Sequence, residues 1–330
     1  MQDAPLFHEI TKGPDTGKAY WVTASDGVRL RVGHWPEHRP ETREAADPSA
    51  PSQGTILLFP GRTEYIEKYG LIASELCALG YHVLTIDWRG QGLADRPDQE
   101  RALGHVGHFD EYQLDVDAMV DLGRQLNLPE PWTLLGHSMG GCIGLRSLYN
   151  GLPVKSAIFS APMWGIAMAT PLRPIAWSLS WALHKTPLAT SLSPGTKRET
   201  YLSISPFEDN MLTTDPDMYT YMADQAKAHP ELTLGGPTVG WLYAALRETQ
   251  DLMSRPAPAT PAVSFLGTQE RIVQPGPIHK HMAKWSNGEL IMVPGAEHEV
   301  LMEAQAIRQQ VYDALDRLET GKPKADPVSA

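Results

Sequence analysis

Short apolar segments alternate with amphipathic segments along most of this chain, and that alternation limits the folds it can adopt. The apolar segments contain little charge and lie at residues 55–59, 82–86, 132–135, 154–159, 262–266 and 289–293. Strands of this composition are buried on both faces, as in a parallel sheet. We therefore expect these segments to form the centre of one sheet.

Segments with helical periodicity lie between the apolar ones. Residues 65–79 and 109–126 each place apolar side chains on one stripe, and further helices are predicted at 278–285 and up to about residue 318. A hairpin is predicted at 19–36, with its turn at Ser25-Asp26-Gly27. Alternating strands and helices indicate the α/β class, with a mostly parallel central sheet covered by helices on both faces.

The alternation breaks between residues 163 and 236. This segment is rich in large adaptable side chains and in prolines, at Met163, Trp164, Met168, Trp177, Trp181, Met211, Met218, Met222, Pro171, Pro174, Pro187, Pro194 and Pro206. We predict that 163–236 is an inserted lid with short helices, between core segments 1–162 and 237–319. Ordinary core packing is the alternative for any one of these methionines or tryptophans. Residues 37–54 are predicted to form a solvated loop, and 320–330 a flexible tail.

The charge balance and the cysteine count exclude several classes of partner and site. With 28 Lys and Arg against 39 Asp and Glu, the formal net charge is −11, which argues against nucleic acid or an anionic membrane surface as the main partner. Cys77 and Cys142 can form neither a disulfide framework nor a thiolate metal cage. The N-terminus lacks a basic segment followed by an apolar run, so we expect no secretory signal and a cytoplasmic protein.

The strongest chemical signal is the sequence Gly-His-Ser-Met-Gly-Gly at 136–141. It follows the predicted strand at 132–135 and opens a predicted helix, and its glycines permit a sharp turn that exposes Ser138. The helix N-terminus then offers free N–H groups to an anion. A glycine-rich turn with an incidental serine is the alternative. We predict Ser138 as a nucleophile.

A serine nucleophile needs a base, and the base needs an orienting acid, here in the chain order Ser, acid, His. His298 follows the strand at 289–293 and is the predicted base; Glu270 follows the strand at 262–266 and is the predicted acid. Residues 161–198 contain no carboxylate, so no acid can follow the earlier strand there.

Glu297 and Glu299 flank the predicted base, but neighbours in a tight loop seldom point at the same ring. The oxyanion needs two backbone N–H donors. One is predicted at Met139, and the other at Arg62 or, as second choice, Thr63, with a surface cation as the alternative for the Arg62 side chain.

These motifs resemble those of the α/β-hydrolase superfamily, and most closely its bacterial lysophospholipase and monoacylglycerol lipase branch. The resemblance covers about residues 20–318, and the matching segments are 59–69, 87–92, 136–141, 210–215 with Tyr219, and 236–241. Two departures are Pro60, where the family usually has His, and Glu270, where it usually has Asp. The resemblance implies the α/β-hydrolase fold with a helical lid. It also implies that His105, His108 and Asp110 cap a helix rather than bind a metal.

Together, the motifs and the resemblance predict a serine carboxylic-ester hydrolase that acts through an acyl-enzyme on monoacyl esters, without cofactor or metal. The alternatives are an acyltransferase with the same triad, a short-chain esterase, and a non-catalytic binding protein. The residues expected to contact a small ester or lipid substrate are Tyr65, His137, Met163 and Trp164. A weak peripheral contact between the lid and the inner membrane is a further expectation. The oligomeric state is left open.

Overall fold

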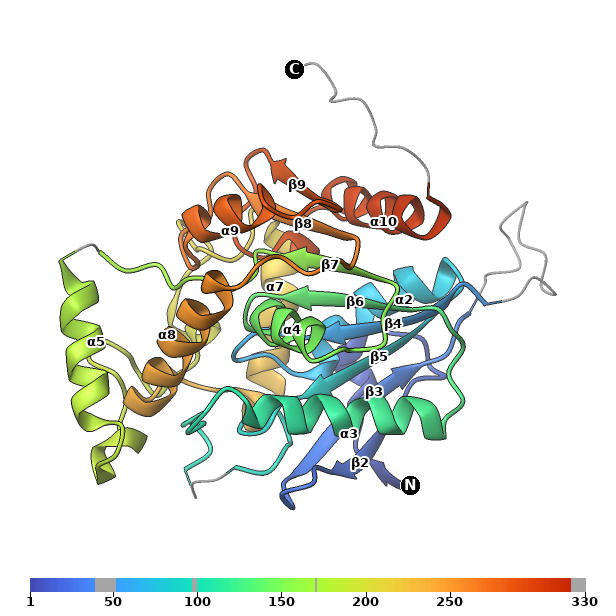
Figure 1. Ribbon diagram of the computed structural model, residues 1–330. Coiled ribbons are helices and arrows are strands. Elements are labelled where there is room, and N and C mark those ends of the chain that lie inside the picture. The colour runs from blue at the N-terminus through green and yellow to red at the C-terminus, as the bar shows by residue number, and fades with distance from the viewer. Residues whose placement is uncertain (39–51, 97–99, 170, 322–330) are drawn as a thin grey trace.

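A single sheet of nine strands runs through the computed structural model (Figure 1), which describes residues 1–38, 52–96, 100–169 and 171–321. The loop predicted at 37–54 and the tail predicted at 320–330 lie mostly outside the described residues. The strands, in chain order, are β1 Gln2–Ala4, β2 Lys18–Thr23, β3 Arg29–Trp35, β4 Gly54–Phe59, β5 Tyr81–Asp87, β6 Trp132–His137, β7 Ser156–Ser160, β8 Ala262–Gly267 and β9 Gly288–Val293.

The sheet order is β1-β2-β3-β5-β4-β6-β7-β8-β9. The first three strands and the β3–β5 pair are antiparallel, and every pairing from β5 to β9 is parallel. All six predicted core strands are present, and the predicted hairpin forms β2 and β3, with Gly27 in the turn at φ 91°. The expected mostly parallel α/β sheet is thereby confirmed. Only β1 was not predicted, because three residues are too few to show a period.

Helices connect and cover the strands. The α-helices are α1 His8–Thr11, α2 Gly70–Ala78, α3 Glu111–Gln125, α4 Met139–Tyr149, α5 Leu172–Leu183, α6 Tyr201–Ile204, α7 Pro216–Ala228, α8 Val239–Ser254, α9 Pro275–Met282 and α10 Gln305–Thr320. Short 3₁₀ helices are η1 Ile66–Tyr69, η2 Pro187–Thr190, η3 Pro230–Leu232 and η4 Val300–Met302. Among the described residues, no helix has the length and apolar composition that crossing a bilayer requires.

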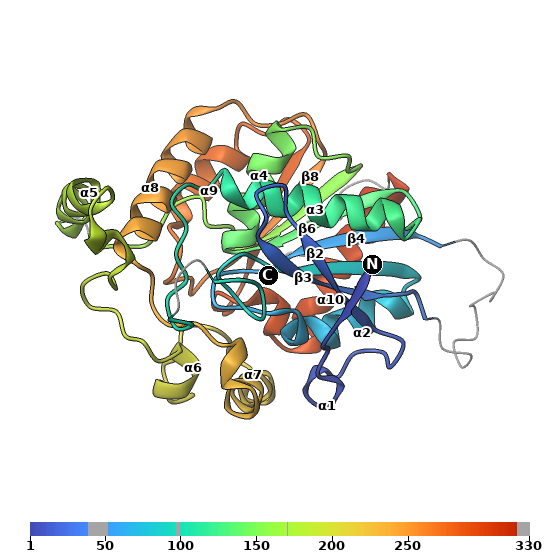
Figure 2. The ribbon, with the colours of Figure 1, turned by 90° about the horizontal axis from the view of Figure 1, so that it is seen from below.

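Two hydrophobic cores lie on opposite faces of the sheet. Side chains from α3, α4, α8 and α9 build one core, and side chains from α2, α7 and α10 build the other. Figure 2 shows α3 and α4 on one side of the strands and α2 and α10 on the other. Because both faces are covered, the central strands must be apolar throughout, which explains the uninterrupted apolar segments of the sequence.

The segment 163–236 folds into α5, η2, α6, α7 and η3. Helix α5 packs on α8, away from the sheet, in both views (Figures 1 and 2). With 12 and 13 residues, α5 and α7 are longer than the short helices expected from the prolines. The reason is that Pro174 and Pro216 lie in first turns, where a missing N–H breaks no helical hydrogen bond.

Candidate active site

Ser138 lies at the turn between β6 and α4, in a backbone conformation that few residues adopt. Its φ is 49° and its ψ is −116°, a strained combination for a residue with a Cβ atom. The turn is also tightly packed, because a Cβ atom at Gly140 would lie only 2.0 Å from the backbone oxygen of Phe59. The strain and the close packing hold Ser138 against the end of β4.

The structure brings the three predicted catalytic side chains into one hydrogen-bonded chain. Nε2 of His298 lies 2.9 Å from Oγ of Ser138, and Nδ1 of His298 lies 2.7 Å from Oε2 of Glu270. With its proton on Nδ1, the ring donates to Glu270 and can accept the serine proton on Nε2. Ser138 is 8 % exposed and His298 is 3 % exposed, so little water competes for these bonds.

Glu270 is held so that one carboxylate oxygen faces the histidine ring. Its other oxygen, Oε1, accepts the backbone N–H groups of Ile272 at 2.6 Å and Val273 at 2.9 Å. Burial by itself raises the pKa of the Glu270 carboxyl. The charge and hydrogen bond of His298 and the two backbone donors lower this pKa by more than burial raises it. The pKa therefore lies below its ordinary value, and the carboxylate is charged at neutral pH.

The two glutamates beside His298 point elsewhere. Glu297 pairs with Arg271 at 2.9 Å, and Glu299 pairs with Lys68 at 2.7 Å. The long Glu270 side chain thus reaches the ring, whereas the neighbours of His298 do not.

The loop that carries His298 is anchored by the segment 210–215, which sequence analysis identified only by resemblance. The backbone oxygens of Met211 and Leu212 accept the N–H groups of His298 and Glu299, at 3.4 and 2.7 Å. The buried carboxylate of Glu303 accepts the N–H groups of Thr214 and Glu297. Sequence reasoning missed Glu303, because a carboxylate that binds only backbone and hydroxyl groups leaves no motif.

The loop after β4 carries both candidates for the second oxyanion donor, Arg62 and Thr63. The N–H of Gly61 donates to the Glu64 carboxylate, and the N–H of Thr63 donates to Oε1 of Gln91 at 2.6 Å. The N–H of Arg62 has no acceptor among the described residues. Thr63 is therefore committed elsewhere, and the geometry favours Arg62 over Thr63.

The predicted motif at 87–92 holds this loop from behind. Nε1 of Trp88 donates to the backbone oxygen of Pro60 at 2.9 Å, and Oδ1 of Asp87 accepts the N–H of Ile66 at 2.9 Å. Gln91, as described above, binds Thr63. The motif therefore fixes the loop after β4, which we call the oxyanion loop after its expected role.

Ser138 and His298 open into a cavity of about 320 Å³ with a mainly apolar wall. Of the predicted substrate-binding residues, Tyr65 and Met163 line this cavity. The other lining side chains are Arg62, Thr63, Glu64, Lys68, Ile166, Thr200, Tyr201, Leu202, Met211, Leu212, Met222, Trp241, Ile272, Val273 and Glu299.

The structure does not bring the other two predicted substrate residues to this cavity. Trp164 is 1 % exposed, packs against Phe159 and Trp285, and lines a separate groove between α5 and α8. His137 is also 1 % exposed and lies behind Ser138, where its ring contacts that of His298 at 4.8 Å between centres. Both side chains therefore pack beneath the site and do not line its cavity.

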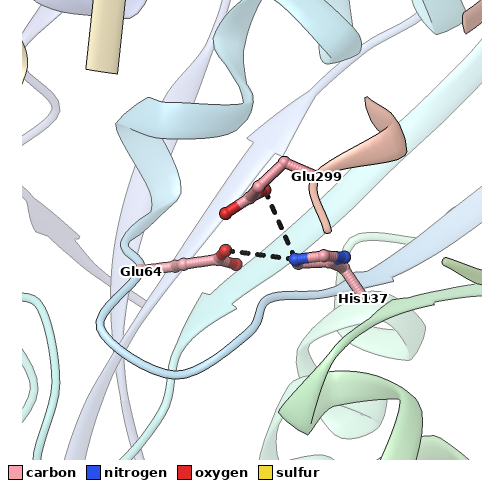
Figure 3. Close-up of side chains that lie close together, drawn as sticks. All are labelled: Glu64, His137 and Glu299. Atoms are coloured by element: carbon pink, nitrogen blue, oxygen red, sulfur yellow. Dashed lines mark ion pairs between the residues drawn. The ribbon is translucent and has the colours of Figure 1, made fainter. Parts of the chain in front are cut away.

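His137 is part of a buried group of charged side chains (Figure 3). Figure 3 shows the carboxylates of Glu64 and Glu299 pointing toward the same ring nitrogen. Nε2 of His137 lies 3.5 Å from Oε1 of Glu64 and 3.3 Å from Oε2 of Glu299. Lys68 bonds both carboxylates, at 2.6 and 2.7 Å. Burial alone lowers the pKa of His137, but the charges of the two carboxylates raise it by more, so the pKa lies above its ordinary value.

The same three residues, Glu64, His137 and Glu299, have ligand atoms close enough together to surround a metal ion. The ammonium of Lys68, however, already bonds one oxygen of each carboxylate. A divalent ion there would face this ammonium at close range, so the donor set does not fit a metal. The other candidate metal pattern in the sequence is His105, His108 and Asp110. In it, Nδ1 of His105 is hydrogen-bonded to Oγ1 of Thr238 at 2.9 Å.

Comparison with known proteins agrees with this geometry. Residues 50–305 match the model of the family described as serine aminopeptidase, S33. Lysophospholipase L2 of Escherichia coli strain K12 is 31 % identical over 273 residues, which cover 79 % of this chain and 78 % of that protein. Monoacylglycerol lipase of Mycolicibacterium smegmatis is 24 % identical over 84 % of this chain and 89 % of its own.

The fold also matches a solved structure, a soluble variant of monoglyceride lipase from Saccharomyces cerevisiae in complex with a substrate analog. Its TM-score is 0.67 at 19 % identity, covering 92 % of this chain and 95 % of that one. This likeness concerns the fold, whereas the family match covers most of the sequence. The chain therefore belongs to the serine aminopeptidase S33 family of α/β hydrolases.

Proposed function

We propose that this hydrolase is a serine carboxylic-ester hydrolase that acts on monoacyl esters through an acyl-enzyme. The observation that carries the proposal is the chain Ser138–His298–Glu270, at 2.9 and 2.7 Å, opening into an apolar cavity. The names of the relatives, lysophospholipase and monoacylglycerol lipase, support the same substrate class.

The geometry accounts for each chemical step. Oγ of Ser138 attacks the ester carbonyl carbon as Nε2 of His298 takes its proton, and Glu270 stabilises the charged ring. The N–H groups of Met139 and Arg62 bind the oxyanion. His298 then protonates the leaving alcohol oxygen, and the ester bond to the alcohol breaks. Water, deprotonated by His298, attacks the acyl-enzyme and releases the acid and free Ser138.

The apolar wall of the cavity suits an acyl chain. Met163, Ile166, Leu202, Met211 and Met222 are among its lining residues, and burying each methylene contributes about 0.8 kcal/mol. Methionine side chains adapt to chains of different shape. We therefore propose a preference for medium to long single acyl chains over triacylglycerols.

The charges in the cavity disfavour an aminopeptidase, the activity in the family's description. Binding the free amino group of a peptide requires an uncompensated carboxylate near the serine. The lining carboxylates Glu64 and Glu299 are both bonded to Lys68, and the side chain of Arg62 adds a further positive charge. Each carboxylate among the described lining residues thus has a bonded cation, and the cavity suits neutral esters better than cationic peptides.

We further propose that α5 makes a weak contact with membranes. Ile175 and Trp181 on α5 are each 60 % exposed, and Leu188 on η2 is 54 % exposed. Residues 161–198 contain Arg173, Lys185, Lys197 and Arg198 but no acidic residue, in a chain of net charge −11. An apolar and basic surface favours anionic lipid. Trp181→Ser should weaken co-sedimentation with anionic vesicles; unchanged sedimentation would contradict the contact.

A series of p-nitrophenyl esters tests the proposed substrate class. We expect kcat/KM to rise from acetate to at least the octanoate ester, because the apolar wall binds each added methylene. A steep fall beyond butyrate would contradict the long-chain preference and leave a short-chain esterase. Product analysis with added glycerol separates hydrolysis from acyl transfer, since a transferase would form a new ester in place of the free acid.

A further inference from the structure

In the oxyanion loop, buried side chains accept the backbone N–H groups on both sides of Arg62. The N–H of Gly61 donates to Oε2 of Glu64, and the N–H of Thr63 donates to Oε1 of Gln91 at 2.6 Å. Glu64 is 5 % exposed and Gln91 is 2 % exposed, so little water competes for either bond. The N–H of Arg62, between them, has no acceptor among the described residues.

Contacts from outside hold this loop in a conformation that its own residues disfavour. Thr63 has a φ of 68°, in the left-handed region that β-branched residues rarely adopt. Such a conformation persists only where the surroundings fix it. The bonds to Glu64 and Gln91 do so, together with the bond from Trp88 to the backbone oxygen of Pro60. The direction of the remaining free N–H group is therefore set by side chains.

Glu64 is itself held from the opposite side. Its Oε1 accepts a hydrogen bond from the ammonium of Lys68 at 2.6 Å, and its Oε2 accepts one from the hydroxyl of Tyr69 at 2.5 Å. The same ammonium bonds Oε1 of Glu299 at 2.7 Å, and Glu299 directly follows His298 in the chain. A buried chain of charges thus joins the oxyanion loop to the loop that carries the predicted base.

These acceptors differ from groups that bind a substrate. Both oxygens of Glu64 and Oε1 of Gln91 are committed to protein donors, so they influence the reaction through the backbone that they hold. An oxyanion develops only as the serine attacks. Donors aimed at its position in advance lower the barrier without strengthening the binding of the substrate. A loop fixed on both sides of a free N–H group is suited to this task.

We propose that Glu64 and Gln91 are positioning residues, which hold the loop so that the N–H of Arg62 points at the oxyanion formed on Ser138. This inference rests on the proposed ester hydrolase function and names the side chains that align its oxyanion hole. The ester in its ground state does not depend on this alignment. Loss of either side chain therefore lowers kcat and leaves KM nearly unchanged.

A pair of inhibitors separates positioning from a merely structural role. With octyl trifluoromethyl ketone, Oγ of Ser138 bonds the carbonyl carbon, the π electrons move to the carbonyl oxygen, and the serine proton goes to His298. Octyl methyl ketone has the same chain but is too weakly electrophilic to form this adduct. We expect Glu64→Met and Gln91→Leu each to raise the Ki of the trifluoromethyl ketone by about tenfold or more. The Ki of the methyl ketone should change by less than about threefold.

Steady-state kinetics with p-nitrophenyl octanoate should show the same division, with kcat about tenfold or more lower in both variants and KM within about threefold. Glu248→Met is the matched control. Glu248 is also 5 % exposed, bonds Arg146 through both oxygens, and lies outside the described lining of the cavity. Its loss should reduce the free energy of unfolding but leave kcat within about threefold of the wild-type value.

Wild-type kcat and Ki values in Glu64→Met or Gln91→Leu overturn the inference, and so does an equal loss of kcat in Glu248→Met. Gln91→Leu decides the matter if Glu64→Met does not fold, because it removes an uncharged acceptor and leaves the ion pairs of Lys68 intact. If the wild-type protein hydrolyses no p-nitrophenyl ester, the proposed function fails, and the two Ki values still test the alignment of the loop.

Discussion

At the scale of single residues, the proposed chemistry depends on how Glu270 is held. The carboxylate gives one oxygen to two backbone N–H groups and the other to Nδ1 of His298 at 2.7 Å. This arrangement compensates for the extra methylene that Glu has relative to Asp, because the longer side chain is fixed at its end. A charged acid in this place keeps the histidine in the tautomer that can accept the serine proton.

Glu270→Gln should lower kcat by about 10³-fold or more, because the neutral amide favours the wrong tautomer and cannot stabilise the charged ring. Steady-state kinetics with p-nitrophenyl octanoate measures the effect. Glu297→Gln is the control, since Glu297 pairs with Arg271 and should change kcat by less than about threefold. If Glu297→Gln proves the more damaging variant, Glu270 is not the acid.

Lys68→Met should reduce the free energy of unfolding by about 3–5 kcal/mol, because it leaves two buried carboxylates with only the His137 ring beside them. The Lys68, Glu64 and Glu299 side chains are 6 % exposed or less. Urea unfolding followed by circular dichroism gives the value. Arg124→Met, which removes an exposed pair with Asp121, should cost no more than about 1 kcal/mol. Equal losses of unfolding free energy in the two variants would show that the folded protein does not need Lys68 to hold the two buried carboxylates.

Sequence reasoning could identify Ser138, Glu270 and His298 as residues that meet, because each follows a strand of the sheet and chain order fixes their roles. It could not find the surroundings of Arg62. That side chain is buried only because Trp241 and Gly235, far along the chain, fold over it. Likewise, nothing in the sequence distinguishes His137 beneath the nucleophile from a residue that faces substrate.

At the scale of elements, the site depends on the close approach of the turn before α4 to the loop after β4. Gly140 allows that approach, and Trp88 holds the loop through the backbone oxygen of Pro60. The two predicted oxyanion donors lie on these two elements. Their alignment is therefore a property of packing between elements, which a one-dimensional pattern of strands and helices does not contain.

Gly140→Ala should lower kcat/KM by about 10²-fold or more, because the added Cβ would meet the backbone oxygen of Phe59 at 2.0 Å and must push the oxyanion loop away. Gly276→Ala is the control, since a Cβ there has no atom within 4 Å. Kinetics together with a thermal unfolding curve separate a displaced loop from an unfolded protein. Full activity in Gly140→Ala would contradict this account of the turn.

At the scale of the whole molecule, we expect the free energy of unfolding to fall in mild acid. Burial is the main cause that lowers the pKa of His281 to about 4; its ring lies against Trp164 and Trp285. In the unfolded chain the pKa is about 6.5. Between pH 4 and pH 6.5 the unfolded state binds more protons than the folded state. The contribution of His281 to the free energy of unfolding is therefore complete above pH 6.5 and is lost as the pH falls toward 4.

His281→Gln should therefore lose less unfolding free energy than wild-type protein between pH 7 and pH 5. Urea titrations at the two pH values measure the difference. His279→Gln, which replaces an exposed histidine on the same helix, should keep the wild-type pH dependence. Identical pH dependence in all three proteins would show that His281 is not protonated on unfolding.

The central claim is that Ser138 is a nucleophile activated by His298, and covalent labelling tests it most directly. Intact-mass analysis and peptide mapping after treatment with a fluorophosphonate should show one adduct, on Ser138. His298→Ala should abolish that adduct while leaving the fold intact, and Ser138→Ala should lose about 10⁴-fold or more of the esterase activity. A label on another serine, or full activity in Ser138→Ala, would contradict the account.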